Sequence, residues 1–156
     1  MTMQRMQSLQ VLMQREQHRC DQAQSALQRA GEVARRAAEQ RDQLLAYRVE
    51  YQSRWTAQFS QGGTMEILQC YRSFMARLDQ AVALQARQAE MAELQLAQAR
   101  HALIENERQL ASVRKLIERR AADIAQAGRQ REQKQTDEQA QRLRWQHQQR
   151  DRLLPQ

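Results

Sequence analysis

Between Leu68 and Ile124 every seventh residue is apolar, and this repeat constrains the fold more than any other feature of the chain. Taken as heptad position a, the nine residues are Leu68, Met75, Val82, Ala89, Leu96, Leu103, Leu110, Ile117 and Ile124. A heptad of this length is typical of a helix that packs along another helix in a left-handed supercoil. The repeat therefore predicts an all-α protein, with one long helix over about residues 65–150.

An earlier heptad predicts the partner of this helix. Its a and d positions run from Met6 to Gln58, and twelve of the sixteen are apolar. This pattern predicts a helix over about residues 4–59. The later helix is longer, so from about residue 123 it has no partner within the chain. We expect this overhang to be a single helix that frays beyond Gly128, in a chain that forms one coiled-coil domain over residues 1–156.

The glycine pair that ends at Gly63 lies midway between the two heptads. Each a residue of one heptad can be paired with a d residue of the other that lies equally far from Gly63 along the chain. Trp55 and Tyr71 are one such pair. Glycine tolerates the positive φ that a tight turn requires. We expect a turn over residues 60–64, with Thr64 as the N-cap of the second helix. The predicted fold is a long antiparallel two-helix coiled-coil hairpin with an overhanging C-terminal helix.

Composition excludes several classes of protein. The 156 residues include 30 Gln, 23 Ala and 23 Arg, and the mean hydropathy is −0.92, which disfavours a compact globule with one large core. No catalytic or phosphate-binding motif is present, and the three histidines are scattered, so we expect no enzyme, no metal and no cofactor. Cys20 is expected in the core and Cys70 outside it. Without a signal peptide or a membrane span, we expect a cytoplasmic protein.

The net charge of +7 favours acidic partners in general. Acidic residues are interspersed nearly throughout, however, and we interpret the charge mainly as a solvated coiled-coil surface.

Aromatic residues are concentrated around the turn, and two of them lie beside the seam at heptad position g. The g positions of both helices share one edge of an antiparallel hairpin, so an apolar strip is expected there. The strip comprises Tyr47 and Phe74 with the partly covered Leu44, Tyr51 and Leu78. Exposed aromatic clusters mark protein interfaces. The alternative is that these rings only thicken the core near the turn. We expect Tyr51, Trp55 and Tyr71 to hold the hairpin shut.

Two strings flank the glycine pair: Gln40-x-x-x-Leu44-x-x-Tyr47-x-x-x-Tyr51 before it and Phe74-x-x-x-Leu78-x-x-Ala81 after it. Together with the basic, Gln-rich helices, they resemble the flagellar export protein FliJ family. The resemblance implies a cytoplasmic stalk of the flagellar type III export apparatus, peripheral to the inner membrane at the flagellar base. Such a stalk looks like the rotary ATPase γ subunit and inserts into the hexameric export ATPase, FliI. It also contacts the export gate protein FlhA and the export chaperones.

The resemblance also implies which residues bind these partners. The gate-binding patch comprises Gln40, Leu44, Tyr47, Tyr51, Phe74, Leu78 and Ala81. A further family position falls on Gln85, where members can carry His, so this chain departs from the pattern there. The contact with the ATPase ring is expected at the other end, and comprises Met6, Leu9, Met13, Ile117, Ile124, Leu143 and Trp145.

Three other interpretations remain open. One is the equivalent stalk protein of a virulence type III injectisome, from which only the tyrosine and phenylalanine pattern separates this chain. The second is a basic coiled coil that binds nucleic acid, although neither a clustered basic helix nor stacking aromatics on a charged face is present. The third is a structural coiled coil of two chains, which the register around Gly63 disfavours.

Overall fold

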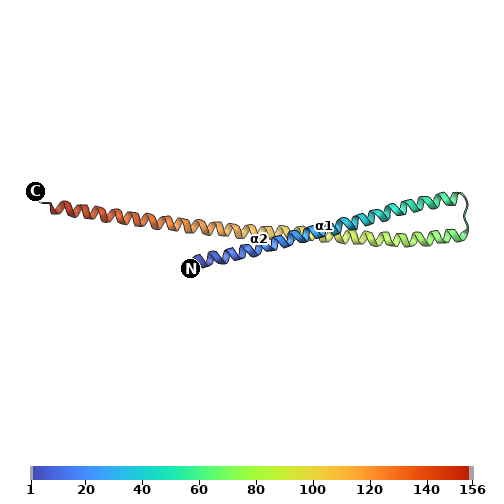
Figure 1. The fold of residues 1–156 in the computed structure, drawn as a ribbon, viewed down its shortest axis with the longest axis horizontal. Coiled ribbons are helices and arrows are strands. Elements are labelled where there is room, and N and C mark those ends of the chain that lie inside the picture. Colours follow the sequence, from blue (N-terminus) through green and yellow to red (C-terminus); the bar gives the residue numbers. More distant parts are fainter. Residues whose placement is uncertain (1, 155–156) are drawn as a thin grey trace. The chain divides into compact units, whose positions relative to one another are not determined.

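The computed structural model describes residues 2–154 and consists of two helices joined by a short turn (Figure 1). α1 spans Thr2–Ser60 and α2 spans Met65–Leu153. Within residues 2–154 there is no strand. The prediction of an all-α helical hairpin is confirmed. Residues 1, 155 and 156, which belong to the single domain expected from the sequence, lie outside the described residues.

The chain separates into two compact units, and each unit takes a segment from both helices. Unit 1 combines Met1–Arg15 with Gln109–Gln156, and unit 2 is Glu16–Arg108, which includes the turn. The contacts described below lie within one unit or the other.

The core of unit 2 is built largely from small side chains. Ala34 and Ala37 of α1 pack against Ala89, Ala92 and Leu96 of α2, and Ala89 is only 2% exposed. A methyl group is the whole side chain of alanine, so two helices that meet through alanines can approach closely. In this unit every predicted seam position except Gln58 is buried or half-buried. The two heptads therefore face each other as their register predicts.

The turn has the chemistry expected of it. Gly62 has a φ of 101°, which side-chain-bearing residues rarely adopt. Gly63 is needed for a different reason, because a Cβ there would lie 3.0 Å from the Phe59 ring. The backbone N–H of Ile67 donates to Thr64 Oγ1 at 3.4 Å, so Thr64 caps α2 as predicted.

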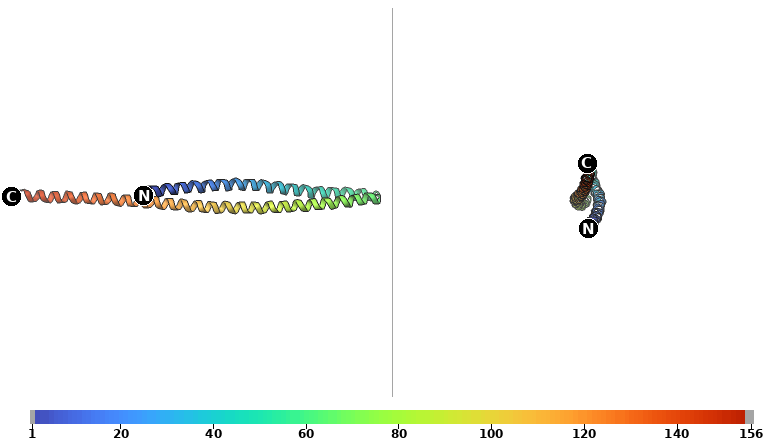
Figure 2. Two further views of the ribbon diagram at one scale, coloured as in Figure 1. Left: turned by 90° about the horizontal axis from the view of Figure 1, so that it is seen from below. Right: turned by 90° about the vertical axis from the view of Figure 1, so that its left-hand side faces the viewer.

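Unit 1 holds the start of α1 and the later part of α2. Leu110 is buried, while Met6, Leu9 and Met13 are half-buried. All residues from 121 to 154 are exposed, and within this unit α2 extends well beyond the N-terminal segment (Figure 2).

The helix expected over about residues 65–150 ends at Leu153, and the residues after Gly128 are helical. The Gln, Arg, Glu and Ala residues that dominate this stretch are strong helix formers, and they outweigh the cost of one glycine.

Candidate functional site

The edge of unit 2 near the turn carries a row of three aromatic rings. The ring centroids of Tyr47 and Tyr51 lie 4.6 Å apart, and those of Tyr51 and Phe74 lie 4.7 Å apart. Tyr51 thus sits between the other two rings and links α1 to α2. Tyr47 is 41% exposed, and Phe74 is half-buried. We call Tyr47, Tyr51 and Phe74 the aromatic strip.

The other residues of the patch implied by the resemblance differ in exposure. Leu78 is buried and Leu44 is half-buried, so both support the strip from beneath. Gln40 and Ala81 are exposed. The predicted patch thus combines three aromatic rings with two covered leucines and two exposed residues.

A second aromatic cluster closes the hairpin beside the turn. The ring of Trp55 lies 5.2 Å from Tyr71 and 5.6 Å from Phe59, and Phe59 lies 5.6 Å from Tyr71. The predicted contact between Trp55 and Tyr71 is confirmed. Tyr51 also joins the two helices, but through Phe74 in the strip. Phe59, which was not predicted to lie here, completes the second cluster, and its position one helical turn after Trp55 was the signal for it.

Polar contacts between the helices hold the strip in place. Gln85 Nε2 donates to Gln40 Oε1 at 3.1 Å and to the backbone carbonyl of Ala37 at 3.4 Å. Arg48 Nε and Asp79 Oδ1 form an ion pair between the helices at 2.8 Å. The sequence marked Gln85 only as a departure from the family pattern. In the structure this side chain bridges the helices and positions Gln40, which belongs to the patch.

The surroundings of the Tyr47 phenol favour its neutral form. Its pKa is raised above the ordinary value, first by the hydrogen bond with the Tyr51 side chain and then by desolvation. An uncharged phenol suits a surface that a protein partner must desolvate, since it offers one polar group on a large apolar ring.

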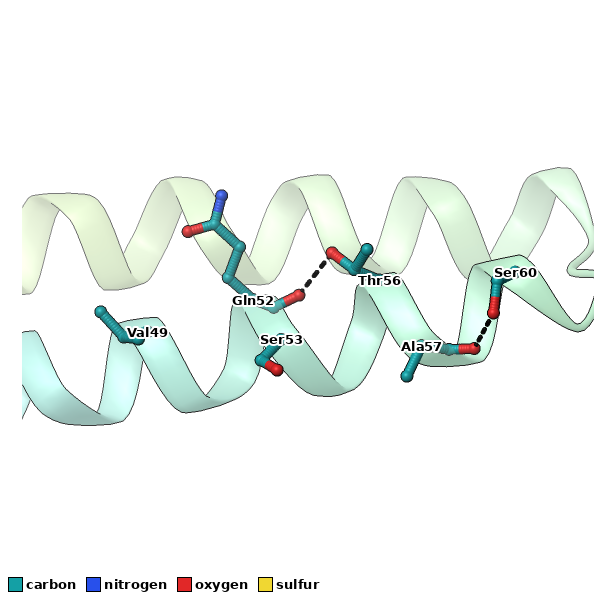
Figure 3. Close-up of a pocket in the computed structure, with 6 residues that line it drawn as sticks. All are labelled: Val49, Gln52, Ser53, Thr56, Ala57 and Ser60. Atoms are coloured by element: carbon teal, nitrogen blue, oxygen red, sulfur yellow. Dashed lines mark hydrogen bonds between the residues drawn. The ribbon is translucent and has the colours of Figure 1, made fainter.

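A hollow of about 580 Å³ lies on α1 near the turn, lined by Val49, Gln52, Ser53, Thr56, Ala57 and Ser60 (Figure 3). All six residues come from one face of one helix. The hydroxyls of Thr56 and Ser60 donate to backbone carbonyls, at 2.7 and 2.6 Å (Figure 3). Over residues 2–154, His, Cys, Asp and Glu side chains form no cluster that could hold a metal ion.

The charge of the protein is unevenly distributed. Unit 2 contains 12 Arg and 12 acidic residues, so its formal charge is zero. Unit 1 contains 13 Arg and Lys but only 6 acidic residues, and therefore carries the whole net charge of +7. The aromatic strip thus belongs to a neutral unit.

The residues expected to contact an ATPase ring all lie in unit 1. Met6, Leu9, Met13 and Ile117 are half-buried, as seam residues should be. Three others are exposed: Ile124 at 44%, Leu143 at 57% and Trp145 at 60%. Leu143 and Trp145 lie in the part of α2 where every residue is exposed, so unit 1 offers apolar side chains without a partner in this chain.

A comparison with protein-family models matches the flagellar FliJ protein over residues 5–149. The chain belongs to the FliJ family. The search of curated proteins and the search of solved structures gave no significant match. As a FliJ-family member the protein is related to flagellar export. Neither helix, over the residues that the structure describes, is long and apolar enough to cross a membrane.

Proposed function

We propose that this FliJ-family protein is the cytoplasmic stalk that links the flagellar export ATPase to the export gate. Unit 1 would insert into the hexameric, FliI-like ATPase and promote its assembly and activity. The aromatic strip of unit 2 would bind the FlhA-like gate, which places the stalk at the inner membrane indirectly. Handling of export chaperones belongs to the same role, and the protein acts as a structural coupler, not as a catalyst.

One observation carries this proposal: the chain presents two unpartnered surfaces of different chemistry, one in each unit. The strip is aromatic and lies in a unit of zero formal charge. Unit 1 is strongly basic and exposes apolar side chains such as Trp145. Two surfaces of such different character suit two different partners better than one.

The strip has the features of an interface hot spot. Tyrosine and tryptophan dominate such sites because a rigid ring buries a large area at a low cost in conformational entropy. Tyr47 is accessible, while its neighbour Tyr51 and the tie between Gln85 and Gln40 restrict movement beneath it. The surface is therefore ordered before a partner arrives, which reduces the entropy lost on binding.

The strip is tested with Tyr47→Ala, measured as the affinity for the purified cytoplasmic domain of the gate protein. Loss of a hot-spot ring is expected to weaken binding by about 2 kcal/mol, or roughly thirtyfold. The matched control is Val49→Ala, which truncates a side chain that is 67% exposed and lies outside the strip. Equal effects of the two substitutions, or no effect of Tyr47→Ala, would contradict the assignment of the strip.

Unit 1 is tested by ending the chain after Gly128. This truncation removes Leu143 and Trp145 and most of the stretch of α2 in which every residue is exposed. We expect the shortened protein to lose its stimulation of ATPase assembly and activity, and to bind the gate domain with unchanged affinity. Stimulation that survives the truncation would contradict insertion of this part of α2 into the ring.

A further inference from the structure

Unit 1 contains a cleft between the first turns of α1 and the part of α2 that faces them. Its volume is about 170 Å³. It is lined by Arg5, Met6, Arg120, Asp123, Ile124 and Ala127. For comparison, a cavity of roughly 150 Å³ can hold a molecule of the size of benzene. The cleft can therefore accept one apolar side chain.

The floor of the cleft is a stretch of seam that α1 does not cover completely. Met6 is half-buried, whereas Ile124 and Ala127 are exposed although they occupy heptad positions a and d. Ile124 is 44% exposed, so the described part of α1 leaves much of its side chain uncovered. Elsewhere along the seam the opposite helix covers such apolar side chains. At Ile124 and Ala127 they are available to a partner.

The rim of the cleft is cationic. Arg5 and Arg120 both line it, and within the described part of the chain neither of them forms an ion pair. Asp123 is the single acidic residue in the lining, so two guanidinium groups face one carboxylate. The excess of positive charge in unit 1 as a whole acts in the same direction.

We propose that this cleft binds an aliphatic side chain presented by an acidic protein segment. The aliphatic group would fill the space above Met6 and Ile124, and neighbouring carboxylates would accept hydrogen bonds from Arg5 and Arg120. If the proposed function holds, that segment belongs to the export ATPase, so this assignment of the partner rests on it.

A protein segment fits the cleft better than a nucleic acid does. The phosphates and sugars of a nucleic acid would gain nothing from the apolar floor, which an aliphatic side chain would fill. No aromatic residue lines the cleft to stack with a base.

The cleft itself is tested by methyl NMR of the full chain with three synthetic probes. The probes are a short Glu- and Leu-rich peptide, its counterpart with Gln in place of Glu, and an oligonucleotide of similar charge. We expect the acidic peptide to shift the methyl signals of Met6 and Ile124 and to leave Ile67, in unit 2, unchanged. Equal shifts with the neutral peptide, or equal shifts with the oligonucleotide, would overturn the proposal.

The identity of the partner is tested by titrating the purified hexameric export ATPase with wild type and two double variants. We expect Arg5→Gln with Arg120→Gln to weaken binding by roughly a hundredfold, because each lost charge-assisted hydrogen bond is worth about a factor of ten. The matched control, Arg72→Gln with Arg87→Gln, removes the same charge from unit 2 and should leave affinity unchanged.

The outcomes separate the two proposals. If both double variants lost the same affinity for the ATPase, the proposal for the cleft would be wrong, and general attraction between opposite charges would explain the binding. If wild type does not bind the ATPase but the acidic peptide still shifts Met6 and Ile124, the cleft stands and its assignment to the ATPase falls. If none of the three probes shifts the Met6 and Ile124 signals, but truncation after Gly128 still abolishes ATPase stimulation, the proposed function stands and the proposal for the cleft is wrong.

Discussion

Replacing Gly31 with alanine should stabilise the protein, and the structure gives the size of the effect. Gly31 lies in the interior of α1, where a glycine costs about 1 kcal/mol relative to alanine. A Cβ at this position would lie 3.9 Å from Leu96 Cδ1, which is ordinary van der Waals contact. The added methyl therefore meets no steric obstacle and gains a neighbour across the seam.

The two contributions have the same sign. Helix propensity accounts for about 1 kcal/mol, and partial burial of one methyl group adds up to about 0.5 kcal/mol, since full burial of a methylene is worth about 0.8. For a chain of this size, a gain of about 1 kcal/mol raises the melting temperature by roughly 2–4 °C. We expect a rise in this range, with a matching increase in the urea midpoint and an unchanged m-value.

The measurement is chemical and thermal unfolding followed by circular dichroism, with Gly62→Ala as the contrasting variant. Gly62 has open space around its missing Cβ, but its φ of 101° strains any other residue. The same substitution should therefore destabilise by about 1–2 kcal/mol at Gly62. If Gly31→Ala lowered the free energy of unfolding, the helices would have to lie closer together beside Leu96 than described. If both variants changed stability in the same direction, backbone conformation would not be the cause.

Three further predictions concern unit 2. Ala89→Leu should lower the free energy of unfolding by about 1–3 kcal/mol, because Ala89 is 2% exposed in a core of small side chains, and thermal unfolding beside the exposed control Ala97→Leu checks this. Gln85→Ala should cost about 0.5–1.5 kcal/mol and weaken gate binding by releasing Gln40, whereas Gln88→Ala, at an exposed position, should do neither. Because the folded pKa of Tyr47 is raised, its contribution to stability should be complete below about pH 10 and be lost as the pH rises through the raised pKa. Ultraviolet titration compared with Tyr47→Phe measures this, and a phenol at Tyr47 that ionises at or below the ordinary pKa would contradict it.

Much of the fold could be predicted because the relevant signals are periodic and agree with one another. The heptad from Leu68 indicated a long packed helix, and the common centre of the two heptads at Gly63 indicated an intramolecular partner. Trp55 and Tyr71, predicted to face each other from this register, have ring centroids 5.2 Å apart. Register determines which backbones meet, so contacts that depend on register alone were predictable.

Contacts that depend on side-chain direction were not predictable in the same way. Tyr51 occupies a seam position, and its ring contacts Tyr47 on its own helix as well as Phe74 on the other helix. Phe59 lies outside the a and d positions and still contacts Trp55 and Tyr71. Heptad position predicts which face of the helix a residue lies on. Which neighbours a large ring contacts on that face depends on how the side chains pack. The role of Gln85 as a bridge also required the positions of both helices.

The repeat that fixes the fold also explains why the candidate sites lie where they do. Seam positions must remain mostly apolar for the helices to pair, so residues beside the seam and residues beyond its end are the ones free to specialise. In unit 2 the aromatic rings of Tyr47 and Phe74 lie beside the seam, and the formal charge of the unit is zero. Unit 1 carries the whole net positive charge, and its apolar seam residue Ile124 is 44% exposed. A low-complexity helical sequence can thus carry two distinct binding chemistries, because pairing of the helices constrains only two positions in each heptad.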